Sequence, residues 1–223
     1  MRKNFAPLVP WTSELLSDAD GLRIERLVAP SVLIGWREIR RGDEQALLPE
    51  EARALQRAVE GVRRQSGAAR FVARALMARL GAAPGPILRP DRGAPIWPPG
   101  IVGSLAHDGR MAVACVARGD DVASLGVDVE PDEPLPPELR ETVATSRERG
   151  RYGAGFLAGR WLFAAKEAVF KATFPLDGAW LDFHDIEVDL DLGLATTSSG
   201  RRVKLRFRPS VHLVVLAWID REL

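Results

Sequence analysis

The order of hydrophobic and polar residues along the chain predicts helices first and strands afterwards. Pro49 to Val62 begins with a proline and two acids, as helices often do, and Ala68 to Leu80 ends at Gly81, a common helix stop. Ala82 to Gly100 is rich in proline and glycine, which predicts a loop. Apolar and polar residues then alternate, which predicts three strands at Ile101 to His107, Met111 to Ala117 and Ser124 to Glu130.

The second half of the chain repeats this order of elements. Helices are predicted at Pro136 to Thr145 and Ala158 to Phe174, and strands follow at Ile186 to Leu192, Val203 to Phe207 and His212 to Ile219. The repeat is one of elements, without detectable sequence identity. We therefore expect an α+β fold, a pseudo-dimer of two similar halves (1–121 and 122–223), each a small antiparallel sheet packed with helices.

Composition narrows the class of protein. At 223 residues and 46% hydrophobic content, the chain can bury one substantial core or two small ones. The net charge is +1, so no global field recruits nucleic acid or an anionic membrane, and we expect neither as a partner. The single Cys115 cannot form an internal disulfide, which favours a reducing compartment. Phe5 to Trp11 is too short for a leader or a membrane span, so we expect a cytoplasmic protein, and a monomer.

Two acids lie on one face of the predicted strand that ends at Glu130. Side chains two apart in a strand share a face, so Asp128 and Glu130 project together, opposite the apolar Val127 and Val129. Like charges this close repel, whereas a hard divalent cation such as magnesium favours carboxylate oxygens. The alternative is a solvated strand end before the turn at Pro131.

The predicted helix around Glu167 carries a second charged group. Its apolar residues recur at three- and four-residue spacing, and Glu167 and Lys171 lie one turn apart. An ordinary ion pair on an exposed helix is the alternative. However, the chain has only four lysines, and two of them, Lys166 and Lys171, flank Glu167. Lysine supplies a compact charge that suits phosphate, so this helix is a candidate phosphate-binding element.

Other candidate anion-binding residues lie in the first half. Arg63, Arg64, Arg70 and Arg74 fall on or before the second predicted helix, and Arg89 and Arg92 lie in the loop that follows it. A solvated arginine-rich surface explains these residues about equally well. Ser104 and His107 are too close in sequence to indicate a hydrolase triad, because the base of a triad converges from elsewhere. His184 and His212 lack the spacing of a zinc site.

Several short segments then occur in a fixed order between about Arg63 and the C-terminus. They are Trp97–Gly100, Gly103-Ser-Leu-Ala-His107, Gly126-Val-Asp-Val-Glu130 and Ala165-Lys-Glu-Ala-Val-Phe-Lys171, followed by Phe174–Leu176 and Trp180–Phe183. In order and spacing these segments resemble the 4'-phosphopantetheinyl transferases of the surfactin- and enterobactin-synthetase type.

The resemblance implies a pseudo-dimeric fold and transfer of the phosphopantetheine arm of coenzyme A to a conserved serine of an acyl or peptidyl carrier protein, with release of 3',5'-ADP. It implies Mg²⁺ held by Asp128 and Glu167, with Glu130 binding directly or through water, and Glu167 as a candidate general base. The resemblance also implies which residues contact the coenzyme A phosphates or the leaving group, namely Lys166, Lys171, Ser104, His107, Arg70 and Arg89.

One departure from the family pattern concerns the start of the second helix. The family usually carries an Arg and then Glu-Phe just before the position of Arg70, whereas this chain has Val62-Arg-Arg-Gln-Ser-Gly67. We assign the displaced phosphate-binding arginine to Arg63, with Ser66 as an alternative helix cap. Two other functions stay open: another Mg-dependent enzyme of phosphate esters, and a non-catalytic carrier- or nucleic-acid-binding module. The near-zero net charge and the three acids argue against the non-catalytic binding module.

Overall fold

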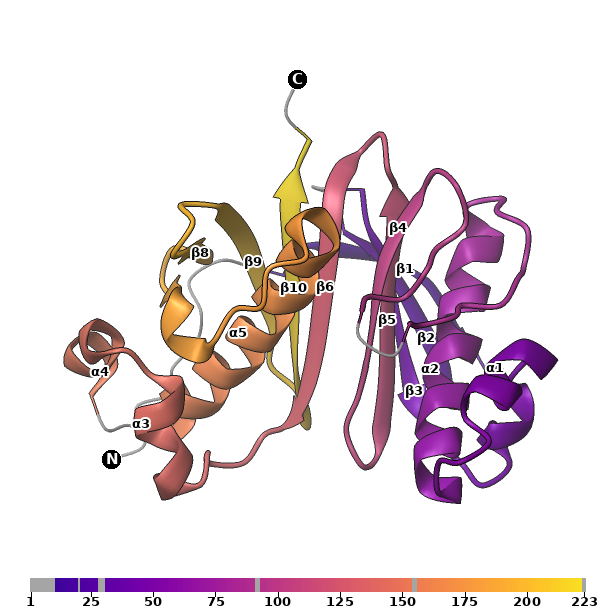
Figure 1. Cartoon of the computed structure of the whole chain (residues 1–223), viewed down its shortest axis with the longest axis horizontal. Helices are drawn as coiled ribbons and strands as arrows, with labels where there is room; N and C mark the ends of the chain where they lie inside the picture. Colours follow the sequence, from indigo (N-terminus) through magenta and orange to yellow (C-terminus); the bar gives the residue numbers. More distant parts are fainter. Residues whose placement is uncertain (1–10, 20, 28–30, 91–92, 154–155, 222–223) are drawn as a thin grey trace.

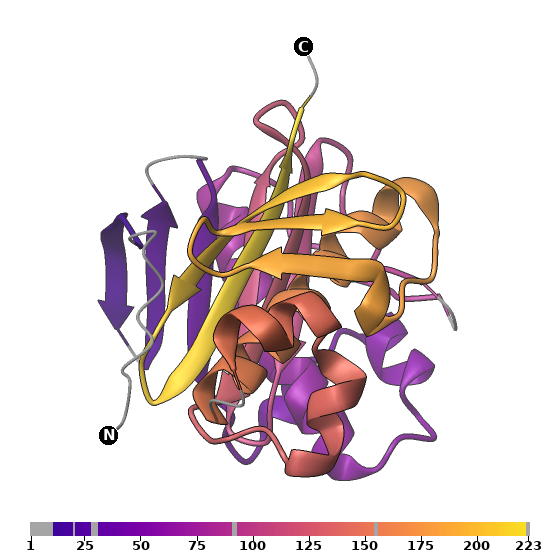
Figure 2. The same cartoon turned by 90° about the vertical axis from the view of Figure 1, so that its left-hand side faces the viewer.

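The computed structural model describes residues 11–19, 21–27, 31–90, 93–153 and 156–221. Within them, the strands form two five-stranded antiparallel sheets that pack face to face, and a long helix covers the outer face of each (Figure 1). The first sheet has the order β1-β2-β3-β5-β4 and the second β6-β10-β9-β8-β7. In Figure 2, β10 crosses the front of the molecule, and the first sheet extends beyond it on one side.

The first sheet contains β1 (Ser13–Ala19), β2 (Leu22–Leu27), β3 (Leu33–Glu38), β4 (Ile101–His107) and β5 (Met111–Arg118). The second contains β6 (Val122–Pro131), β7 (Ile186–Asp189), β8 (Leu194–Thr197), β9 (Arg202–Arg208) and β10 (His212–Asp220). The α-helices are α1 (Pro49–Ala54), α2 (Glu60–Arg79), α3 (Arg140–Val143), α4 (Ser146–Tyr152) and α5 (Phe156–Asp177). Short 3-10 turns are η1 (Asp43–Ala46), η2 (Pro137–Leu139) and η3 (Phe183–Asp185).

Alternation along the strands produces the layers. On β5, Val113 and Cys115 are buried between the two sheets, whereas Ala114 and Val116 are buried against α2. The second sheet is covered in the same way, with α5 on its outer face and a separate apolar cluster between them. The central strands β5 and β10 are therefore buried on both faces, whereas β9 is buried on one face only, and the contact between the sheets joins the two halves.

The expected α+β fold with two similar halves is confirmed, as are the strands β4, β5, β9 and β10 and most of α5. Strand β6 follows β5 after a short turn but pairs with β10, so the chain crosses there from the first sheet to the second. The pattern of hydrophobic and polar residues did not predict β1, β2, β3, β8 and α4. No described helix has the length and apolar character needed to cross a bilayer.

The predicted helix over Pro49 to Val62 was wrong, because α1 ends at Ala54 and α2 already begins at Glu60. Ser66 consequently lies inside α2 and caps nothing, and Arg63 belongs to the first turn of that helix. Gly67 is required in the middle of α2, because a Cβ at this position would collide with the backbone carbonyl of Asp43. The close approach of η1 to α2 thus explains a glycine in a helix interior, where it otherwise costs stability.

Candidate active site between the two halves

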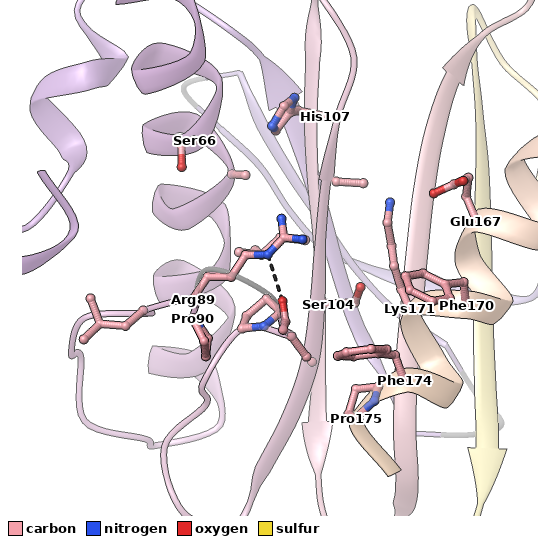
Figure 3. A pocket seen from close by; sticks show the side chains of 18 of the residues that line it. Ser66, Arg89, Pro90, Ser104, His107, Glu167, Phe170, Lys171, Phe174 and Pro175 are labelled. Carbon is pink, nitrogen blue, oxygen red and sulfur yellow. Dashed lines mark hydrogen bonds between the residues drawn. The ribbon is translucent and has the colours of Figure 1, made fainter. Parts of the chain in front are cut away.

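A pocket of about 1000 Å³ lies between the halves, and both halves line it. The first half contributes residues of α1 and α2, the loop of residues 88–95, and strand β4. The second half contributes one face of α5 and the segment that follows it. Figure 3 shows Arg89 and Ser66 on one side, Glu167 and Lys171 on the other, and β4 with Ser104 and His107 between them.

The contact between α5 and β6 positions the charged groups of the second half. A Cβ at Gly126 would collide with the carbonyl of Ala168, so only glycine allows the helix to lie this close to the strand. Ala168 and Ala172, which face β6, are fully buried. This packing brings Lys171 over the strand, where its Nζ donates to Asp128 Oδ1 at 2.6 Å and to the carbonyl of Val127 at 3.2 Å.

Asp128 is the most buried acid of this region, with 6% of its surface exposed. Its Oδ2 is buried and has no hydrogen-bond partner in the described part of the chain. Burial raises the pKa of this carboxyl group, although the ammonium group of Lys171 opposes the shift. Burying a carboxylate oxygen without a hydrogen-bond donor destabilises the folded protein, and a cation bound to this atom would offset that loss.

Glu130 and Glu167 flank Asp128 in different environments. Glu130 shares the α5 side of β6 with Asp128, as strand alternation predicts, and accepts a 2.6 Å hydrogen bond from Arg160 Nη1. Glu167 lines the pocket from α5. Burial raises the pKa of both carboxyl groups, and the charge of Asp128 raises each further. Among the described residues, no group of three or more His, Cys, Asp or Glu side chains is already arranged to hold a metal.

Lys166 occupies a different environment from Lys171, although both are on α5. Its Nζ donates to Glu148 Oε2 at 2.7 Å and to the carbonyls of Val143 at 2.8 Å and Phe183 at 2.9 Å. The side chain is fully buried. Burial lowers the pKa of Lys166, while Glu148 opposes that shift. All three ammonium donors therefore have acceptors within the protein, and the structure does not present this charge to a phosphate.

The first half holds its charges in a closed network. Arg70 is buried, donates from Nε to the carbonyl of Ile87 at 2.9 Å and contacts the Ser66 hydroxyl, and burial lowers its pKa. Glu51 lies 3.6 Å from Arg70 and accepts from Arg74 at 3.0 Å and from the backbone N–H of Ile87 at 2.8 Å. The sequence analysis treated this glutamate only as an acid in the first turn of a helix.

Of the remaining candidate anion-binding residues, Arg89, Ser104 and His107 line the pocket, whereas Arg63, Arg64 and Arg74 do not. Arg89 donates from Nε to the carbonyl of Gly93 at 2.8 Å, and its guanidinium group extends into the pocket (Figure 3). Ser104 is buried on β4, and His107 ends that strand with a pKa lowered by burial and by Lys171. Arg63 is not among the lining residues, although its buried Nε has no hydrogen-bond partner in the described regions. Arg92 lies outside those regions.

Aromatic side chains form the other end of the pocket. The lining residues at this end are Phe170, Phe174, Pro175, Trp180 and Leu181. The rings of Phe170 and Trp180 pack edge to face, with centroids 5.0 Å apart, and Trp180 is 79% exposed. One pocket thus combines a polar part, with Arg89, His107 and Lys171, and an apolar part that reaches the surface.

Comparisons with known proteins match both halves. Residues 50–117 match the 4'-phosphopantetheinyl transferase N-terminal domain, and residues 124–214 match the 4'-phosphopantetheinyl transferase superfamily. The chain is 46% identical over 159 residues to 4'-phosphopantetheinyl transferase Svp of Streptomyces mobaraensis, covering 67% of this chain and 64% of that protein.

Two further relatives agree with these matches. The chain is 40% identical over 157 residues to 4'-phosphopantetheinyl transferase PptT of Mycobacterium tuberculosis, covering 69% of this chain and 67% of that protein. It is 34% identical over 99 residues to enterobactin synthase component D of Escherichia coli K12, covering 41% and 46%. The resemblance seen in the sequence motifs is confirmed, and the chain belongs to the 4'-phosphopantetheinyl transferase family.

Proposed function

We propose that this protein transfers the 4'-phosphopantetheine arm of coenzyme A to a serine of an acyl or peptidyl carrier protein, with Mg²⁺, and releases 3',5'-ADP. The observation that carries the proposal is the composition of the pocket. Its polar part suits the phosphates of coenzyme A, and its apolar part suits an uncharged arm that must reach the surface. Glu167 and Lys171 line the pocket from α5, on the side opposite Arg89, where the pyrophosphate would lie.

The side chains that extend into the pocket can contact the phosphates of coenzyme A. The guanidinium group of Arg89 extends into the pocket, and its two terminal nitrogens remain available to a phosphate. Ser104 and His107 offer further hydrogen bonds, and Lys171 supplies a compact charge for the pyrophosphate. Arg70 is held by Ile87 and Ser66 and acts mainly by adding positive charge to that wall. Lys166 supports α5 instead of touching substrate.

The acids fit a magnesium ion. Asp128 offers a buried oxygen that has no donor among the described residues, Glu167 lines the pocket close enough for the charge of Asp128 to raise its pKa, and all-oxygen ligands are what Mg²⁺ prefers. Glu130 is bound by Arg160, so we assign it contact with the ion through water. When bound, the ion would neutralise negative charge on the pyrophosphate.

The reaction requires a proton acceptor and a proton donor from the chain. The carrier serine oxygen attacks the phosphorus next to the pantetheine arm, and the bond from that phosphorus to the bridging oxygen breaks. Glu167 takes the serine proton, a role that a pKa raised by burial favours. Lys171 stabilises the leaving 3',5'-ADP by charge and can donate a proton to it.

The test uses purified protein, several apo carrier proteins from fatty-acid, polyketide and peptide synthesis, coenzyme A and Mg²⁺. Mass spectrometry should show the carrier heavier by one phosphopantetheine group, and 3',5'-ADP should form in equal amount. Carriers whose acceptor serine is replaced by alanine are the matched control. No mass increase on any apo carrier would refute the transferase function. A cytoplasmic monomer stays a prediction.

A further inference from the structure

A hydrogen bond beside the pocket joins the two halves of the molecule. His212 Nδ1 lies 2.6 Å from Asp108 Oδ2, although the two residues are 104 positions apart. The side chains are 9% and 11% exposed, so water has little access to this pair. Neither residue lines the pocket.

Asp108 is fixed within the turn between β4 and β5. Its Oδ1 accepts hydrogen bonds from the backbone N–H groups of Arg110 and Met111, both at 2.6 Å. Its own N–H donates to the carbonyl of Met111 at 3.0 Å. The turn begins directly after His107, so any force on the Asp108 carboxylate acts on the position of His107.

His212 is fixed to the strands that carry the acids. It begins β10, where it lies opposite Pro131 of β6, and the next residues place Leu213 opposite Glu130 and Val215 opposite Asp128. Ser210 Oγ donates to the carbonyl of His212 at 2.5 Å and holds the start of the strand. The pair therefore connects the turn after His107 to the strand pair that presents the acids.

We propose that Asp108 and His212 are positioning residues that set the place of His107 relative to Asp128 and Glu130. The inference rests on the proposed function, in which these groups contact different parts of coenzyme A. The apolar contact between the two sheets is non-directional, whereas a short hydrogen bond fixes both distance and angle. A displacement of about 1 Å in a catalytic site can cost roughly 100-fold in rate.

A second pair between the halves offers a matched control. Arg208 on β9 lies 3.7 Å from Glu25 on β2, and neither residue lines the pocket. Glu25 also accepts hydrogen bonds from Trp11, Ser13 and Arg23, so it keeps partners when Arg208 is replaced. If both pairs only stabilised the fold, substitutions in either pair would have the same effect on kcat. If Asp108 and His212 position the site, only substitutions in that pair should lower kcat.

The experiment compares His212→Leu, His212→Asn and Arg208→Met with the unmodified protein. Asparagine can place an N–H donor near the position of Nδ1, so it should restore the contact that leucine removes. We expect His212→Leu to lower kcat about 10-fold or more with a smaller change in KM for coenzyme A. His212→Asn should recover most of this loss, and Arg208→Met should keep kcat within about 2-fold while lowering Tm.

Equal losses of kcat in His212→Leu and Arg208→Met, or a lower Tm with unchanged kcat in His212→Leu, would overturn the positioning role. Should His212→Leu not fold, His212→Phe gives the same comparison, because its ring fills a similar volume and cannot form a hydrogen bond with Asp108.

Hydrogen exchange provides a measurement that does not depend on transfer. In His212→Leu the amides of Arg110 and Met111 should exchange faster, whereas in Arg208→Met they should not. Unchanged exchange would overturn the inference even in an active enzyme. An unmodified protein that transfers nothing would instead refute the proposed function, and exchange would still decide whether the pair fixes the turn.

Discussion

The two walls of the pocket handle buried charge in opposite ways. In the first half, Glu51 is 1% exposed, but Arg74 and backbone N–H groups of Leu48 and Ile87 satisfy its oxygens. In the second half, Asp128 is almost as buried, yet Oδ2 has no partner among the described residues. Glu51 is thus satisfied within the protein, whereas Asp128 keeps one oxygen without a donor in the described regions. This difference separates a carboxylate that stabilises the fold from one that is suited to bind a cation.

The largest effect should come from removing the acids of the second wall. Asp128→Asn and Glu167→Gln should each lower kcat/KM for transfer about 100- to 1,000-fold or more, because each removes charge stabilisation at the reacting phosphate. The Tm of both variants should stay within a few degrees of the unmodified protein, because burial of these carboxylates already lowers the stability of the fold. Steady-state kinetics with coenzyme A and an apo carrier, together with thermal unfolding, measure both quantities.

Glu51→Gln is the matched variant on the first wall. It should lose stability, because an amide cannot serve all the donors that the carboxylate accepts, while the kcat of the folded fraction changes little. Normal activity in Asp128→Asn would contradict the assignment of the second wall to catalysis.

The two lysines of α5 sharpen the comparison within one helix. Lys166→Met should lower the free energy of unfolding by about 3–5 kcal/mol, because Glu148 is left as a buried charge. Lys171→Met should lower it by less, because the Lys171 side chain is 28% exposed and Asp128, whose pKa is raised by burial, can take up a proton when its partner is removed, yet the variant should lose most activity. Denaturant unfolding measures both. Adding Glu148→Gln to Lys166→Met should restore part of the stability, and no restoration would show that the loss has another origin.

The sequence predicts the second wall better than the first for a physical reason. Asp128, Glu130, Glu167 and Lys171 are positioned by regular elements, a strand and a helix, whose side-chain periods can be read from the sequence. Gly126 and Ala168 then set how closely the helix approaches the strand. The environment of Lys166 depends on Glu148 of α4, a short helix that the sequence analysis missed. The buried hydrogen bonds of Lys166 were therefore not predictable from the sequence.

The first half shows why other elements were not foreseen. Strand β2 alternates apolar and polar residues only from Leu22 to Glu25, a run too short to predict a strand, and Arg26 breaks the pattern. Glu25 is nevertheless buried, because Trp11, Ser13 and Arg23 satisfy it. The break between α1 and α2 has no glycine or proline between Ala54 and Glu60 to mark it. Tertiary contacts decided these features, and periodicity does not report them.

Magnesium should stabilise the protein more at high pH than at low pH. Burial raises the pKa of Asp128, Glu130 and Glu167 in the folded protein. The folded state thus binds more protons than the unfolded state, and the protonated groups contribute stability at low pH. That stability is lost as the pH rises from the ordinary pKa values, 3.8 for Asp and 4.5 for Glu, through the raised pKa values of the folded protein. In the proposed site Mg²⁺ would bind the deprotonated groups and so offset this loss.

Thermal unfolding with and without Mg²⁺ at pH 5 and pH 8 tests this difference. The increase in Tm caused by Mg²⁺ should be a few degrees larger at pH 8, and Asp128→Asn should reduce it. Glu51→Gln is the control and should keep the full increase relative to its own Tm. An increase of equal size at both pH values would argue against ion binding by these carboxylates.

The smallest effect distinguishes the arginines of the first half. Arg89 extends into the pocket, whereas Arg63 lies outside the residues that line it. If Arg89 binds the 3'-phosphate, Arg89→Ala should raise the KM for coenzyme A about 10-fold, as loss of one charged hydrogen bond predicts, and should change the KM for dephospho-coenzyme A much less. Arg63→Ala should change both constants by less than about 2-fold. The reverse result would assign the 3'-phosphate to Arg63 and would require the start of α2 to move toward the pocket when coenzyme A binds.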